Sequence, residues 1–210
     1  GTDAIEVALR SLDIGCGDEV ITVSHTAVAT VAAIEATGAK AVLVDVEKDF
    51  FTLDFKLLKK ALTKKTKAII PVHLYGQSAN MDEIKKFSKL HNLYIVEDVS
   101  QAHGASFKNK KLGSVGHIGC FSCYPTKNLG ALGDAGLITT NDRKLYNKIK
   151  ILREYGWKIR NKSQIPGRNS RLDEIQASIL SIKLKKLDEW NKKRSLIALK
   201  YSSEITNIKI

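Results

Sequence analysis

Residues 68–98, AIIPVHLYGQSANMDEIKKFSKLHNLYIVED, decide the fold class. Two short apolar runs flank a stretch whose apolar residues have helical spacing, which predicts a strand at 68–72, a helix at 81–90 and a strand at 93–97. Pro71 marks the exit of the first strand, because proline has no N–H to donate to a sheet. Strands that are almost entirely apolar and separated by helices indicate a parallel sheet buried on both faces.

The same alternation extends over most of the chain. It predicts an α/β fold with a mostly parallel central sheet and helices on both faces, and a boundary near 164–167, where the alternation stops. A helix is expected at 3–12, with Thr2 as its cap. Further strands are predicted at 19–23, 41–46, 118–123 and 136–140, and further helices at 25–37, 57–62, 142–155 and 171–201.

Composition indicates a soluble globular protein. The 210 residues are 43% hydrophobic and 27% charged, which excludes disordered and fibrous classes. The most apolar stretch without charge, 20–34, is too short and too interrupted to span a bilayer, and no secretory signal is visible. Cys16, Cys120 and Cys123 form an odd, sparse set. They indicate reduced thiols in the cytoplasm and no disulfide framework.

The chain is basic, with 34 Lys and Arg against 22 Asp and Glu, a net charge of +12. Clustered positive charge would suggest a nucleic-acid binder. The lysines are instead spread in pairs, and no helix-turn-helix, zinc-finger or RNA-binding aromatic pattern accompanies them. We therefore expect a solvated lysine-rich surface and no nucleic-acid partner. The one functional interpretation of the positive charge that we keep is weak attraction of an anionic substrate.

Chemistry-bearing residues follow the predicted strands. Asp98 ends the 93–97 strand, with Gln101 close behind, and Lys127 follows the 118–123 strand. Ligands of such sheets bind outside the carboxyl ends of the strands. The helix that opens at Thr2 offers free N–H groups to a phosphate. A carboxylate, a lysine and a phosphate cradle are what a pyridoxal phosphate site requires.

Each of these residues has an ordinary alternative. A single loop lysine is more often solvated than catalytic, and Asp98 could simply cap the next helix. Cys120 and Cys123 form a C-x-x-C, for which packing is a better interpretation than redox chemistry. No Cys or His pair has metal-ligand spacing, so no metal site is predicted. A nucleotide-binding oxidoreductase is disfavoured because no G-x-G-x-x-G follows the first strand.

Two long stretches carry a family resemblance: EDVSQAHGA at 97–105 and FSCYPTKNLGALGDAG at 121–136. They closely resemble the signatures of the DegT/DnrJ-type nucleotide-sugar aminotransferases, which are pyridoxal-phosphate enzymes of the aspartate-aminotransferase fold (fold type I). The resemblance implies that 1–165 is the large cofactor-binding domain without its short N-terminal segment. It also implies that 166–210 is a long helical segment leading to a missing small C-terminal domain. Supporting stretches are GTDA at 1–4, HLYGQ at 73–77 and GRNSRLDE at 167–174.

The resemblance also assigns roles at the cofactor ring. Lys127 is expected to form the internal aldimine and then to move a proton between cofactor and substrate. Asp98 is expected to pair with the pyridinium nitrogen, and Gln101 to lie near the ring hydroxyl oxygen. Many relatives carry a ring-stacking aromatic residue where Ala27 stands. His25 is a candidate to take its place.

The remaining roles concern the phosphate and the partner subunit. The resemblance implies that Thr2 and Ser122 hold the phosphate. Asn169 is expected to reach the cofactor of the neighbouring subunit, so the active site would be shared in a homodimer. Arg171 either holds that loop or contacts the sugar nucleotide, and the sequence leaves both roles open.

The predicted reaction transfers an amino group from L-glutamate to a keto-sugar nucleotide, as in deoxysugar and polysaccharide biosynthesis. SHTAV at 24–28 and REYGW at 153–157 resemble the subgroup acting on the C-3 ketone of a dTDP-linked 6-deoxyhexose. Lysine at 127, where dehydrating relatives have histidine, favours transamination. The alternatives are amination at C-4 and a non-catalytic regulatory member of the same fold.

Overall fold

The computed structural model describes residues 1–207, so the last three residues of the predicted 166–210 segment lie outside it. The predicted fold class is confirmed. A six-stranded sheet has the order β2-β1-β3-β4-β7-β8, in which all neighbours are parallel except the antiparallel pair β7 and β8. The strands are β1 Glu19–Val23, β2 Lys40–Val44, β3 Thr66–Ile69, β4 Tyr94–Asp98, β7 Ile118–Ser122 and β8 Gly136–Thr139.

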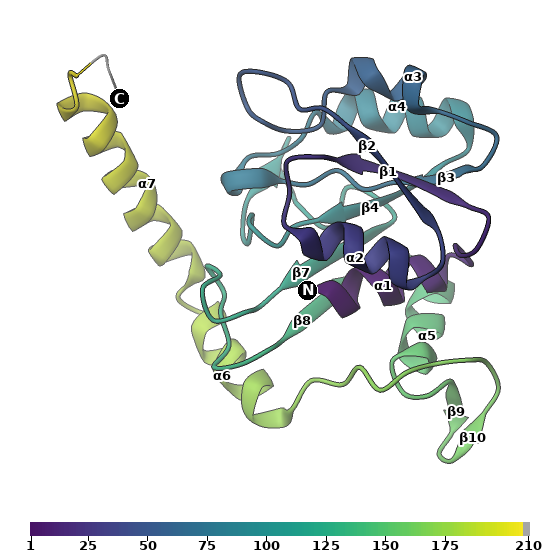
Figure 1. Ribbon diagram of the computed structural model, residues 1–210. Coiled ribbons are helices and arrows are strands. Elements are labelled where there is room, and N and C mark those ends of the chain that lie inside the picture. Colours follow the sequence, from purple (N-terminus) through teal and green to yellow (C-terminus); the bar gives the residue numbers. More distant parts are fainter. Residues whose placement is uncertain (208–210) are drawn as a thin grey trace.

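Helices cover both faces of this sheet (Figure 1). One face carries α1 Thr2–Ser11, α2 Val28–Ala36 and α5 Arg143–Leu152, and the other carries α3 Leu58–Ala61 and α4 Met81–His91. Each face buries its own apolar cluster, one including Leu9 and Val20, the other Ile21 and Ile69. Burial on both sides explains why the central strands are apolar at successive positions.

Short elements decorate the loops. A 3₁₀ turn at Phe55–Leu57 precedes α3, and another at Leu74–Gly76 follows β3. Two small hairpins, absent from the sequence-based prediction, lie outside the sheet: β5 Ser106–Phe107 with β6 Lys110–Lys111, and β9 Trp157–Ile159 with β10 Lys162–Ser163. Within residues 1–207, none of the helices combines the length and apolarity that crossing a membrane requires.

The predicted helix at 25–37 begins later than expected, at Val28. Ala27 is extended at the N-cap position, and the two residues before it use their side chains in other contacts. His25 bonds to Tyr75, and Thr26 Oγ1 lies 3.0 Å from Thr30 Oγ1. The residues after β1 therefore form a loop at the carboxyl edge of the sheet. In this loop His25 can reach Tyr75, a direction that its side chain would not take in a helix.

The prediction of one continuous helix over 171–201 was wrong. Residues 171–173 are not helical, and two helices follow, α6 Glu174–Leu184 and α7 Leu187–Glu204. A tight turn separates them, in which the Lys186 N–H donates to the Lys183 carbonyl at 2.9 Å. The break lets both Leu180 and Leu187 pack against the loop after β7. Tertiary packing thus redirects a segment that contains no Gly or Pro to signal a stop.

Glu97, near the end of β4, links the carboxyl edge of the sheet to the segments that follow β3 and precede β7. Its buried carboxylate accepts a hydrogen bond from His73 Nε2 at 3.0 Å and three more from backbone N–H groups in the 113–116 turn at 2.7 to 3.0 Å. The other ring nitrogen of His73 accepts from the Ala79 N–H, so Nε2 carries the proton. Burial raises the pKa of Glu97, but the bonds from His73 and the turn outweigh burial and hold that pKa below its usual value.

Glu97→Gln is expected to lower the free energy of unfolding by about 2–4 kcal/mol at pH 7, because its amide N–H₂ would face backbone donors. A pKa that is lower in the folded state stabilises the protein above the unfolded value, and this stabilisation disappears as pH falls through the folded pKa. The difference between wild type and variant should therefore narrow below about pH 4. Urea unfolding at both pH values tests this, and an unchanged difference would contradict it.

Candidate active site

Lys127 lies in a compact loop that follows β7. The loop closes on itself through bonds from the Lys127 N–H to the Tyr124 carbonyl, 2.9 Å, and from the Ala131 N–H to the Cys123 carbonyl, 2.8 Å. A Cβ at Gly130 would come within 2.5 Å of the Pro125 carbonyl oxygen, so glycine is required there. Across the described residues, the Lys127 amine has no hydrogen bond or ion pair. A fixed loop therefore presents a free amine at the carboxyl edge of the sheet.

Asp98 lies at the end of β4 and is 4% exposed. Its carboxylate accepts one hydrogen bond on each oxygen, from Thr30 Oγ1 at 2.9 Å and from the Ser100 N–H at 3.1 Å. Ser100 Oγ in turn accepts from the Ser122 N–H at 3.2 Å, which ties the ends of β4 and β7 together. Each carboxylate oxygen keeps a free lone pair. Asp98 is thus a positioned, buried acceptor with one lone pair free on each carboxylate oxygen.

Gln101 has a defined amide orientation. Its Oε1 accepts a hydrogen bond from the Tyr75 backbone N–H at 3.2 Å. A backbone N–H pairs only with the amide oxygen, so the N–H₂ group of Gln101 is left to donate elsewhere. Tyr75 has a left-handed backbone, φ 57°, and its hydroxyl lies 3.0 Å from His25 Nε2. Tyr75 therefore links His25 to Gln101.

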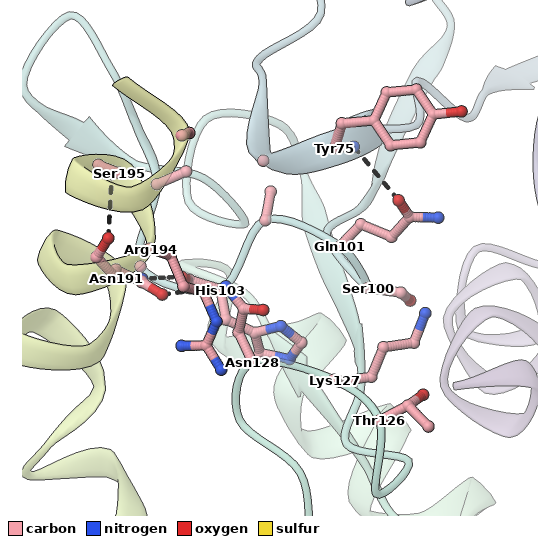
Figure 2. Close-up of a pocket in the computed structure, with 15 residues that line it drawn as sticks. Tyr75, Ser100, Gln101, His103, Thr126, Lys127, Asn128, Asn191, Arg194 and Ser195 are labelled. Carbon is pink, nitrogen blue, oxygen red and sulfur yellow. Dashed lines mark hydrogen bonds between the residues drawn. The ribbon is translucent and has the colours of Figure 1, made fainter. Parts of the chain in front are cut away.

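Lys127, Gln101 and Tyr75 line a cavity of about 680 Å³, whereas Asp98 and His25 do not line it. Figure 2 shows Lys127, Ser100, Gln101 and Tyr75 following one another along one side of it, and residues of α7 on the other side. Asn191 fixes α7 there, because its amide donates to the His103 carbonyl at 2.7 Å and its oxygen accepts from Asn128 at 3.0 Å. The charged residues that line the cavity are Lys127 and Arg194, and no carboxylate lines it.

His103 is buried in the wall of this cavity, and its ring is tilted by 50° against that of Phe121, with 5.6 Å between the ring centroids. Neither ring nitrogen has a hydrogen-bond partner in residues 1–207. Burial, and then the positive charge of Lys127, lower the pKa of His103 to about 4, while Asp98 acts in the opposite direction. His103 is therefore neutral at pH 7.

The start of α1 meets Ser122 at the same edge. A Cβ at Gly1 would come within 2.6 Å of Ser122 Cβ, so the two backbones approach closely. The expectation that Thr2 caps this helix was wrong: Gly1 occupies the N-cap and makes no side-chain bond, and Thr2 is the first helical residue. The first N–H groups of α1 have no partner within the helix. Thr2 and Ser122 thus flank a set of free backbone donors.

Asn169 and Arg171 do not line the Lys127 cavity. Arg171 Nε donates to Asn169 Oδ1 at 2.9 Å, and Asn169 pairs with Glu154 through the backbone. Their segment is held against α1, because Arg168 pairs with Glu6 and Asp3, and Ser170 Oγ donates to Asp3 at 2.8 Å. Asn169 is exposed.

Comparison with known proteins assigns the chain to a family. A sequence model of the DegT/DnrJ/EryC1/StrS aminotransferase family matches residues 1–210. The chain belongs to this family. The family includes a Streptomyces venezuelae dTDP-3-amino-3,4,6-trideoxy-alpha-D-glucose transaminase that is 46% identical over 208 residues, covering 99% of this chain and 55% of the relative. An Aneurinibacillus thermoaerophilus dTDP-3-amino-3,6-dideoxy-alpha-D-galactopyranose transaminase is 48% identical, covering 99% and 57%.

Solved structures of the family agree with the fold. The crystal structure of S. venezuelae DesV in complex with a ketimine intermediate has a TM-score of 0.96 at 45% identity, covering 99% of this chain and 56% of that one. NtdA from Bacillus subtilis with bound cofactor PMP has a TM-score of 0.90 at 34% identity, covering 96% and 46%. The chain thus spans about half the length of the family members it matches.

Several residues of this candidate site could not be found from the sequence. Thr30, Ser100 and Tyr75 hold Asp98 and Gln101 through hydrogen bonds, yet none belongs to a catalytic residue type in a diagnostic pattern. Thr30, for example, lies on α2 and reaches Asp98 of β4 only in the assembled fold, so its role is not visible in the local sequence. Among the described residues, no group of three His, Cys, Asp or Glu side chains is placed to hold a metal ion.

The two cysteines of the C-x-x-C stretch are packing residues. Cys120 and Cys123 are buried and form no disulfide, whereas Cys16 is exposed. Burial raises the pKa of the Cys123 thiol to about 11 and that of Cys120 as well. Reactive thiolates at neutral pH require the opposite shift. Thiol redox chemistry is therefore not supported here.

Thr30→Val is expected to lower the free energy of unfolding by about 2 kcal/mol, because the variant keeps the shape of threonine but removes the donor to the buried Asp98 carboxylate. Thr30→Ser is the matched control: it keeps the hydroxyl and should cost only about 0.8 kcal/mol for the lost methyl group. Urea unfolding at pH 7 measures both. A valine variant no less stable than the serine variant would mean that this bond contributes nothing.

Proposed function

We propose that the chain is the cofactor-binding part of a pyridoxal-phosphate-dependent nucleotide-sugar aminotransferase. It would move an amino group from L-glutamate to a keto-sugar nucleotide, at the C-3 ketone of a dTDP-linked 6-deoxyhexose. The observation that carries this proposal is the free Lys127 amine in the same cavity wall as Gln101 and Ser100, whose backbone N–H donates to buried Asp98. The names of the dTDP-sugar transaminases to which the chain is similar support the substrate class.

The donor set of this site fits pyridoxal phosphate. An aldehyde requires an amine without a partner, which Lys127 supplies. A pyridine nitrogen that carries a proton requires a buried carboxylate with a free lone pair, which Asp98 supplies. A phosphate requires hydroxyls and free N–H groups, which Thr2, Ser122 and the start of α1 supply. The PMP-bound structure of NtdA supports a cofactor of this class.

When bound, the cofactor withdraws electrons from the carbon that gains or loses the amino group. Asp98 would accept a hydrogen bond from the protonated ring nitrogen, and Thr30 and Ser100 hold its carboxylate in place. Gln101 would donate its N–H₂ to the ring hydroxyl oxygen, since its Oε1 is taken by the Tyr75 N–H. Lys127 Nζ would accept the proton that leaves the substrate carbon and pass it to the cofactor. His103 is neutral at pH 7 and therefore adds no positive charge to the cavity.

We also infer a cytoplasmic homodimer with shared active sites. Asn169 would contact the phosphate held by the neighbouring subunit, and its exposure outside the Lys127 cavity supports this role. That His25 contacts the cofactor ring, in place of the aromatic residue missing at Ala27, stays a prediction, because His25 does not line the Lys127 cavity and is linked to it through the Tyr75 hydroxyl. Arg171, bonded to Asn169, would hold that loop. The three free thiols support a reducing compartment.

A regulatory role is the second candidate function. A Geobacillus stearothermophilus relative, 46% identical over 202 residues, is named a pleiotropic regulatory protein. A protein that kept the fold only for regulation would have no need for a free lysine beside a buried carboxylate. The presence of both Lys127 and Asp98 supports catalysis. Amination at C-4 stays the alternative regiochemistry.

Purified protein with pyridoxal phosphate is expected to show a visible absorption band that L-glutamate bleaches. Lys127→Ala should lose the band, because no amine remains to bind the aldehyde. The rate of the half-reaction with glutamate should fall about a hundredfold or more, because Lys127 also moves the proton. Stopped-flow absorption spectroscopy measures both effects. A colourless wild-type protein, tested also with the flanking segments found in its relatives, would reject the proposed function.

Gln101→Glu is expected to raise the dissociation constant for pyridoxal phosphate about tenfold, a loss of roughly 1.4 kcal/mol. The glutamate still accepts from the Tyr75 N–H but presents a charged oxygen where the amide donated. Fluorescence titration with the cofactor provides the measurement. Unchanged affinity would show that the amide does not donate to the cofactor.

A further inference from the structure

A second hollow lies beside the Lys127 cavity, at the carboxyl ends of β1 and β2. It has a volume of about 560 Å³. Tyr75 lines both spaces, so its ring forms the boundary between them. The residues that line this hollow are Ser24, His25, Asp45, Val46, Phe51 and Tyr75.

We call the space lined by these six residues the base hollow. Three of them, His25, Phe51 and Tyr75, carry aromatic rings. The His25 centroid lies 6.3 Å from that of Phe51 and 6.1 Å from that of Tyr75. Phe51 is 47% and Tyr75 62% exposed, although flat apolar rings gain by being covered. Both residues have left-handed backbones, φ 58° and 57°, which bulky residues rarely adopt. The fold holds both rings at the surface at a conformational cost.

The loop that carries Phe51 is fixed without a ligand. Glu47 accepts from the N–H groups of Asp49 and Phe50 at 3.0 and 2.8 Å, and its carbonyl accepts from the Phe51 N–H at 3.1 Å. Gln77 Nε2 reaches the Phe50 carbonyl at 3.4 Å, which ties the loop to the segment of Tyr75. A ligand that enters the base hollow therefore meets rings already in position, so little ordering entropy is lost on binding.

The polar atoms of the base hollow define its ligand. Asp45 uses one carboxylate oxygen to accept from the Val46 N–H at 2.8 Å. Its other oxygen and the Ser24 hydroxyl make no hydrogen bond within residues 1–207. No lysine or arginine lines the space, so it does not suit a phosphate. Flat rings with a carboxylate acceptor at their edge suit a heteroaromatic ring that carries an N–H group.

We propose that the base hollow binds the nucleobase of the nucleotide-sugar substrate, stacked on Phe51 and Tyr75 with an N–H donated to Asp45. The inference rests on the proposed function, because the sugar of the same molecule would lie on the Lys127 side of Tyr75. Thymine and uracil carry such an N–H on their outer edge. The hollow would thus distinguish nucleotide sugars by their base, at a distance from the reacting carbon.

The test compares Phe51→Leu with Phe50→Leu, a matched change in the same loop at a residue that is 57% exposed and does not line the hollow. Calorimetric titration with dTDP, with pyrophosphate as the probe that lacks a base, should show binding of dTDP and much weaker binding of pyrophosphate. Phe51→Leu should weaken dTDP binding about tenfold, and Phe50→Leu less than twofold. Asp45→Asn should weaken it as well, because the amide can place an N–H₂ against the base.

The same variants separate this inference from the proposed function. Phe51→Leu should keep the visible band with pyridoxal phosphate and its bleaching by L-glutamate, because Phe51 does not line the Lys127 cavity. If dTDP does not bind, or binds equally to wild type and Phe51→Leu, the base hollow is not a nucleobase site, whatever the absorption spectrum shows. If dTDP binding depends on Phe51 in a protein that stays colourless with pyridoxal phosphate, the nucleobase site stands and the aminotransferase proposal fails.

Discussion

Two neighbouring buried carboxylates at the end of β4 impose the main constraint on this structure. Glu97 and Asp98 point to opposite sides of the strand, and neither charge tolerates burial without donors. Glu97 obtains its donors from His73 and the 113–116 turn, and Asp98 from Thr30 and Ser100. Satisfying these two side chains fixes the exit of β3, the N-terminal part of α2 and the approach to β7. The loops of the site are therefore set by electrostatics as much as by apolar packing.

The loop that carries Lys127 is held in place by α6 and α7. Leu129 packs with Leu180 and Leu187, and Asn191 bonds to Asn128. The break between α6 and α7 makes these contacts possible, because it allows two helices to approach one loop from different angles. A lysine amine without a partner requires such support. Its own side chain contributes no bond that would hold the loop in place.

Tyr75 connects the Lys127 cavity and the base hollow. Its N–H orients Gln101 in the cavity of Lys127, its hydroxyl bonds to His25, and its ring borders the base hollow. Tyr75 adopts an unfavourable left-handed backbone conformation in the position where it contacts both spaces. Reaction at one end of a nucleotide sugar and recognition at the other would thus share one residue. This arrangement lets base recognition position the sugar ketone.

The sequence by itself determined the α/β class, the order of most elements and the family, because strand and helix periodicities are local and the 97–105 and 121–136 signatures are long. It also singled out Asp98, Gln101, Ser122 and Lys127, which follow strands whose carboxyl ends share one edge. Only the tertiary structure decided where the helix at 171–201 breaks, that Gly1 rather than Thr2 occupies the N-cap of α1, and that Thr30 and Tyr75 serve Asp98 and Gln101. Those features depend on contacts between segments far apart in the chain, and local propensity carries no record of them.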